Sequence, residues 1–132
     1  METALTILVW QRANNRCEYC QIRHDYDEVT FEIDHIISRK HGGLTQASNL
    51  ALSCFHCNVY KGSDIAGRTP GRRKLTPLFN PRRMKWSKHF QWNGPILVGR
   101  TDIGRVTIAL LNVNDLFRIE LRRGLIEEGH FP

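Results

Sequence analysis

Long apolar runs are missing from this sequence. No stretch of the 132 residues stays apolar over the length that spans a membrane, and acidic Glu2 does not fit the basic start of a signal peptide. We therefore expect a protein of the reducing cytoplasm with no membrane partner. In such a compartment, paired cysteines bind metal far more often than they form structural disulfides.

Acidic residues are scarce in one part of the chain. The formal net charge of +6 divides into −2 over residues 1–60, +9 over residues 61–100 and −1 over residues 101–132. A basic block of this kind favours a polyanion such as DNA as partner, although a solvated surface that only aids solubility is the alternative. The basic residues that we expect to contact DNA are Lys61, Arg72, Arg73, Lys74, Arg82, Arg83 and Lys85.

Cysteine is limited to four residues, which form two identical Cys-x-x-Cys pairs. Cys17 and Cys20 make the first pair, and Cys54 and Cys57 make the second. A short turn in each pair directs both sulfurs to one point, so we predict one tetrahedral Zn²⁺ bound by four thiolates. Such a closed shell leaves no open position, which makes the zinc structural; free core cysteines are the alternative. The segment between the pairs is longer than in simple zinc ribbons and leaves room for two strands.

The residue pattern around these pairs predicts two strands and two helices. Residues 4–16 have the apolar spacing of a helix. Val29–Ile33 alternates in polarity and is rich in β-branched and aromatic residues, which is typical of a strand. Leu50–Ser53 is expected to form the second strand, and a helix follows over Phe55–Tyr60.

The C-terminal half has a different composition. Three of the five prolines fall within residues 63–85, so no long regular element is expected there. Residues 91–99 resemble a strand or a hairpin, and helices are expected after Thr101 and Asn114. We therefore predict a small single α+β domain over residues 1–132, made of a core at 12–62, a basic loop-rich segment at 63–100 and a helical extension at 101–132.

Aromatic and basic residues alternate at one point of this half. Trp86, Phe90 and Trp92 lie close in sequence to Lys88 and His89. We expect the three aromatic rings to form a local hydrophobic cluster. Stacking of the rings on splayed nucleic-acid bases is the alternative.

Asp34 and His35 follow the first predicted strand and have the chemistry of phosphodiester hydrolysis. A histidine can take the proton of an attacking water near neutral pH. An adjacent carboxylate can hold a hard divalent cation, which stabilises the charge that develops on the phosphate. We expect the amide oxygen of Asn49 to fix the imidazole, and that of Asn58 to contact the cation.

The combined pattern EIDHIISRKHGG, then NL, then CxxCNxxKG resembles the HNH endonuclease family. The resemblance covers residues 12–62 and implies a ββα-metal finger, here with the two Cys-x-x-Cys pairs of a zinc-containing subgroup. It implies that His35 is the general base, Asp34 the first metal ligand and Asn49 the residue that orients the base. Asn58 stands where the last histidine of the motif often stands, which makes this chain an HNN variant.

These observations together predict a metal-dependent endonuclease that hydrolyses phosphodiester bonds in DNA. The catalytic cation is expected to be Mg²⁺, Mn²⁺ or Ni²⁺, separate from the structural Zn²⁺. A zinc-stabilised nucleic-acid-binding module with an inactive site, and a nuclease directed at RNA, are the alternatives. The intact set of Asp34, His35, Asn49 and Asn58 favours the enzyme, because a binding module does not need these residues. The sequence does not specify the oligomeric state or the cleavage sequence.

Overall fold

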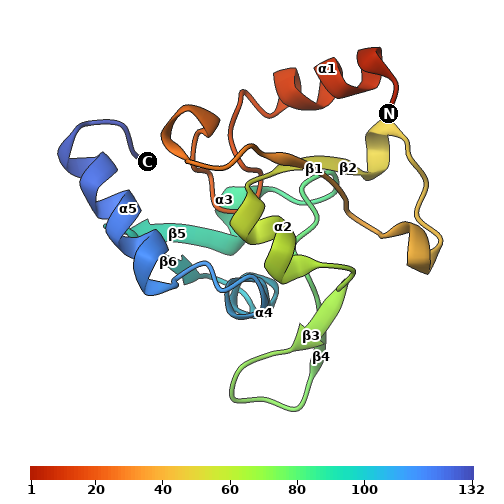
Figure 1. The fold of residues 1–132 in the computed structure, drawn as a ribbon. Coiled ribbons are helices and arrows are strands. Elements are labelled where there is room, and N and C mark those ends of the chain that lie inside the picture. The colour runs from red at the N-terminus through yellow and green to blue at the C-terminus, as the bar shows by residue number, and fades with distance from the viewer.

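Short helices alternate with three antiparallel hairpins along the chain (Figure 1). The computed structural model describes all residues from Met1 to Pro132. The helices are α1 (Thr3–Arg12), α2 (Phe55–Lys61), α3 (Trp86–His89), α4 (Asp102–Leu110) and α5 (Leu116–Glu127), with 3-10 turns at His24–Tyr26, Arg39–His41 and Ala47–Asn49. The strands are β1 (Glu32–His35), β2 (Leu50–Ser53), β3 (Ala66–Arg68), β4 (Leu75–Pro77), β5 (Phe90–Asn93) and β6 (Ile96–Gly99). No helix combines the length and the apolar character needed to cross a membrane.

The first hairpin and the helix after it form a ββα unit. Strands β1 and β2 pair in antiparallel fashion, with Asp34 opposite Ala51 and His35 opposite Leu50. All four residues of β2 are buried, because α1 packs against this strand. Helix α2 begins directly after Cys54, whose sulfur accepts a hydrogen bond from the Cys57 amide, and it packs against β1. This arrangement confirms the predicted fold class.

The first strand lies later in the chain than the sequence predicts. It runs over Glu32–His35 instead of Val29–Ile33, and therefore contains the Asp-His pair itself. Pairing with β2 begins only at Glu32, opposite Ser53, while Val29 and Thr30 are exposed and have no partner strand. The β-branched residues at 29 and 30 therefore do not extend the strand, because β2 is too short to provide them with a partner.

The C-terminal half is more regular than its proline content suggests. The expected hairpin at residues 91–99 is present as β5 and β6, and a second one, β3–β4, lies within the segment expected to be loop-rich. Helix α4 packs against β6 and also against β3 and β4. The individual strands have only three or four residues, which is compatible with the prolines between them.

One hydrophobic core joins the two halves of the chain. It contains 22 buried residues, among them the four cysteines as well as Phe79, Phe90 and Leu125 from the C-terminal half. The C-terminal helices therefore complete the core of the ββα unit. This shared core holds the loop after β1 and the segment at residues 78–84 in fixed relative positions.

Candidate active site and zinc site

The four cysteines converge on one point. Their sulfur atoms all lie within 4.8 Å of one another and are buried. The Sγ atoms of Cys20 and Cys54 are 3.7 Å apart, and the edge of a ZnS₄ tetrahedron with bonds of about 2.3 Å is about 3.8 Å. The donor set and its spacing fit Zn²⁺, as predicted from the sequence.

The buried thiols lie so close together that each shifts the pKa of its neighbours. Hydrogen bonds with Cys17 and Cys54 lower the pKa of Cys20 well below its ordinary value, while hydrogen bonds with Cys17 and Cys20 raise the pKa values of Cys54 and Cys57 well above theirs. A bound Zn²⁺ would displace the thiol protons and stabilise four thiolates.

An arginine side chain supports the cysteine cluster from the C-terminal half. Arg118 on α5 makes a two-pronged ion pair with Asp27, with N–O distances of 3.2 and 3.0 Å, and its Nη2 lies 3.6 Å from the Cys54 sulfur. Burial alone would lower the pKa of Arg118, but the hydrogen bonds to Asp27 and the nearby thiols raise it above its ordinary value. A permanent positive charge beside the sulfurs offsets part of the negative charge of a ZnS₄ centre.

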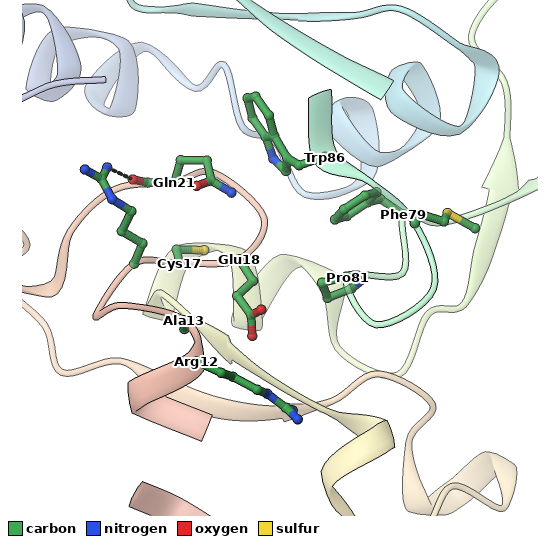
Figure 2. A pocket seen from close by; sticks show the side chains of 10 residues that line it. Arg12, Ala13, Cys17, Glu18, Gln21, Phe79, Pro81 and Trp86 are labelled. Carbon is green, nitrogen blue, oxygen red and sulfur yellow. Dashed lines mark hydrogen bonds between the residues drawn. The ribbon is translucent and has the colours of Figure 1, made fainter. Parts of the chain in front are cut away.

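A pocket lies beside the first cysteine pair (Figure 2). Arg12, Cys17 and Glu18 line it from the N-terminal part, and Phe79 and Trp86 line it from the C-terminal part. His35 does not line this pocket. We therefore assign the pocket to the junction of the two halves and not to the candidate catalytic residues.

The aromatic residues beside this pocket pack on each other. The ring centroid of Trp86 lies 5.1 Å from that of Phe90 and 5.9 Å from that of Trp92, and its indole N–H donates to the Tyr19 carbonyl at 2.8 Å. Phe90 is fully buried. The expected hydrophobic cluster is therefore present, and its rings are engaged within the protein.

Asp34 is part of a buried polar network. Its Oδ2 accepts a hydrogen bond of 2.7 Å from Tyr19 and lies 3.1 Å from Nζ of Lys61, which is also 3.2 Å from Oδ1. Only 5% of Asp34 and 2% of Lys61 are exposed. Burial raises the pKa of Asp34, while the charge of Lys61 and the bond from Tyr19 act in the opposite direction.

Lys61 does not have the position that the sequence predicts. Its ammonium donates to Asp34 and also to the backbone oxygens of His35, at 3.2 Å, and Ile36, at 3.1 Å. The expected contact with DNA phosphate is therefore wrong for this residue. Because α2 packs on β1, the lysine points into the protein and ties the helix to the strand that carries His35.

The surroundings of Asp34 do not fit a second cation bound to this carboxylate. Both carboxylate oxygens already have partners, and the side chain is almost fully covered. Asn58, the other expected ligand, is half-buried on α2. Apart from the four cysteines, no cluster of three histidine, cysteine or acidic side chains has metal-binding spacing.

The His35 side chain is half-buried and is held by a residue that sequence patterns did not identify. Its Nε2 lies 2.8 Å from the hydroxyl oxygen of Thr45, in the loop between β1 and β2. Nothing in the sequence distinguishes this threonine from other loop residues, because the contact depends on how the loop folds back. Thr45 therefore has the orienting position that we expected Asn49 to have.

Asn49 instead fixes the backbone of that loop. Its amide oxygen accepts from the Ile37 N–H at 2.9 Å, and its amide nitrogen donates to the carbonyls of Ile37, at 2.9 Å, and Leu44, at 3.0 Å. The expected hydrogen bond between the Asn49 amide oxygen and the His35 imidazole is therefore wrong, because this oxygen bonds to the Ile37 N–H. Asn49 acts one step away, because the loop that it holds contains Thr45.

Gly43 makes the compact form of this loop possible. A Cβ atom at this position would lie 1.7 Å from the Ile37 carbonyl oxygen and 2.8 Å from the Asn49 amide nitrogen. No side chain fits such a space. Gly43 is thus required by the close approach of two backbone segments around Asn49.

The remaining basic residues fall into two groups. Arg82 is 16% exposed and bonds to Glu18 and to the Leu50 carbonyl, so its guanidinium is engaged within the protein and its contact with DNA stays a prediction. The others are exposed, and three of them lie between β3 and β4 in the hairpin that projects from the molecule (Figure 1). The exposed members are Arg72, Arg73, Lys74, Arg83 and Lys85.

Comparison with known proteins agrees with this geometry. Residues 17–64 match the family model described as HNH endonuclease, a range that overlaps the predicted core at 12–62. The chain is similar to the Septu protein PtuB of Bacillus thuringiensis, with 27% identity over 124 residues that cover 92% of this chain and 46% of that protein. It therefore spans about half the length of that relative. No solved structure matches the chain. The ββα unit and His35 thus lie within residues 17–64, the range that is similar to the HNH endonuclease model.

Proposed function

We propose that this protein is an endonuclease that hydrolyses phosphodiester bonds in DNA, with His35 as the general base. The observation that carries the proposal is the half-exposed imidazole at the end of β1, in contact with Thr45 and on a backbone held by Lys61. A side chain positioned in this way can take the proton of a water that attacks phosphorus. Fixing the ring before substrate binds reduces the cost of reaching the reactive arrangement.

Several features support DNA as the substrate. The net charge of +9 over residues 61–100 attracts a polyanion. The exposed arginines and lysine between β3 and β4 provide phosphate contacts without selecting a base sequence. The family match supports nuclease chemistry in general. The choice of DNA over RNA belongs to this proposal.

The metal requirement is also part of the proposal. One structural Zn²⁺ is held by the four cysteines and takes no part in the reaction, because its shell is closed. The family resemblance adds a catalytic Mg²⁺, Mn²⁺ or Ni²⁺, but Asp34 is engaged by Lys61 and Tyr19 in this arrangement. The cation series below therefore tests metal dependence separately from the role of His35.

The experiment uses purified zinc-loaded protein with supercoiled plasmid and with labelled DNA and RNA of the same sequence. Each is incubated with Mg²⁺, Mn²⁺ or Ni²⁺, and with EDTA. We expect nicked or linear plasmid and cleavage of the labelled DNA. Cleavage of RNA alone supports the RNA-directed alternative. Binding without cleavage of either substrate under any cation supports the binding-module alternative and contradicts the proposal.

A further inference from the structure

A cleft of about 410 Å³ lies between the β1–β2 loop and the turn at residues 80–83. The first side contains His41, Gln46 and Ser48, and the second contains Asn80 and Arg83. These segments are far apart in sequence and meet because the C-terminal half completes the core of the ββα unit. A volume of this size lies in the range of ligand sites and accommodates one nucleotide unit.

The cleft is lined by hydrogen-bond donors that the protein leaves unused. The side chains of His41, Gln46, Ser48 and Arg83 make no hydrogen bond or ion pair within the chain. The Asn80 oxygen accepts from the Arg82 amide, but its side-chain nitrogen has no partner. Free donors grouped in one concave site point to an acceptor-rich ligand.

The charge of the lining selects the sign of that ligand. No carboxylate lines the cleft, so a cation has no suitable partner there. Arg82 is neutralised by Glu18, whereas the charge of Arg83 has no counterion. A planar guanidinium beside amide and imidazole donors matches the oxygens of a phosphate group.

The cleft is connected to the candidate catalytic residue through a single loop. Thr45 contacts the imidazole of His35 at 2.8 Å, and its two sequence neighbours, Leu44 and Gln46, both line the cleft. The Asn49 side chain, which holds this loop, lines the cleft as well. A ligand in the cleft therefore lies beside the loop that orients the base.

We propose that this cleft binds the sugar–phosphate backbone of the substrate strand at a phosphate next to the one that is cleaved. Arg83 and His41 contact the phosphate oxygens, while Gln46 and Asn80 donate to phosphate or sugar oxygens. Such contacts position a strand and carry no base specificity. The inference rests on the proposed nuclease function and adds the place where the strand is held.

The test measures binding apart from cleavage. The double variant His41→Ala/Arg83→Glu is compared with the parent and with Arg123→Glu, which makes the same charge change as Arg83→Glu on α5, away from the β1–β2 loop (Figure 1). Fluorescence anisotropy with a labelled duplex, the matching single strand and RNA of the same sequence gives Kd over a range of salt concentrations. Zinc content and thermal melting of each variant establish that the fold is retained.

We expect the double variant to bind at least about tenfold more weakly, because it loses hydrogen bonds to a charged phosphate group. Its salt slope falls by about one unit for each phosphate that the protein no longer neutralises, while Arg123→Glu stays close to the parent. The probe whose affinity decreases most identifies the strand type.

The two proposals fail in different ways. If the double variant folds, still cleaves DNA and keeps the affinity and salt slope of the parent, the proposed binding role of the cleft is contradicted. The proposed nuclease function is then unaffected. If the parent protein cleaves no nucleic acid but the double variant binds more weakly, the cleft remains a binding site for the sugar–phosphate backbone. The proposed nuclease function is then contradicted. A parent protein that binds none of the probes contradicts both.

Discussion

The Nζ atom of Lys61 on α2 lies 3.1 Å from Oδ2 of Asp34 on β1, and both side chains are buried. The same ammonium donates to the backbone oxygens of His35 and Ile36. The lysine therefore joins the helix to the strand at the candidate base. The structural role of this pair and the proposed catalytic role of His35 concern neighbouring residues, and substitutions distinguish the two roles.

Lys61→Met removes the cation and leaves the Asp34 carboxylate buried without its charge partner. Breaking a buried pair in this way costs about 3–5 kcal/mol, so the free energy of unfolding falls by that amount. Urea denaturation of the zinc-loaded protein measures the decrease. The double variant Asp34→Asn/Lys61→Met, which removes both charges, is expected to be destabilised less than the single one. A single variant as stable as the parent contradicts the buried network.

Removing the zinc is expected to unfold the ββα unit, because the four buried thiols depend on the ion and metal binding is coupled to folding. Elemental analysis of the parent should give one zinc per chain. Cys54→Ser should lose the zinc and the cooperative unfolding transition. A reduced, metal-free parent that still unfolds cooperatively at the same denaturant concentration is incompatible with this role.

Thr45→Val keeps the size of the side chain but removes the hydroxyl that contacts His35. A free imidazole reaches the reactive orientation less often, so we expect kcat to fall by up to about tenfold with little change in KM, which corresponds to the net value of one hydrogen bond. Thr45→Ser, which retains the hydroxyl, should restore most of the rate. Equal cleavage rates for Thr45→Val and the parent would contradict a role of Thr45 in orienting His35.

Gly43→Ala places a methyl group against the Ile37 carbonyl and the Asn49 amide, at positions that no atom can occupy without displacement of the loop. We expect lower stability and lower cleavage activity, measured by thermal melting and by plasmid nicking. Gly124→Ala on α5 is the control, since nothing lies within 4 Å of its added Cβ and alanine favours a helix. Normal cleavage activity in Gly43→Ala would contradict the requirement for glycine in this loop.

The four-cysteine cluster and the ββα order were predictable because they depend on local spacing. A Cys-x-x-Cys turn places two sulfurs together whatever surrounds it, and the second strand leads directly into the turn with Cys54. The bounds of β1 were less predictable. They depend on which residues of β2 are available for pairing, and this is a tertiary property.

The roles of Lys61, Arg82 and Thr45 could not be obtained from the sequence. Lysine and arginine are usually exposed, so a basic block is interpreted as surface until a buried partner such as Asp34 is known. The partner of Arg82 is Glu18, far away in the chain, and Thr45 reaches His35 only through the fold of its loop. Each depends on contacts between segments that no spacing rule relates.

The most direct test of the proposed function compares single-turnover cleavage of plasmid DNA by the parent and by His35→Ala, with His130→Ala as the matched histidine control. Because a positioned general base contributes about 10²–10⁴-fold, we expect the rate of His35→Ala to fall by a factor in that range. Zinc content, thermal melting and DNA affinity should remain near those of the parent, and His130→Ala should cleave normally. A His35→Ala protein that cleaves DNA at the parent rate would contradict His35 as the base.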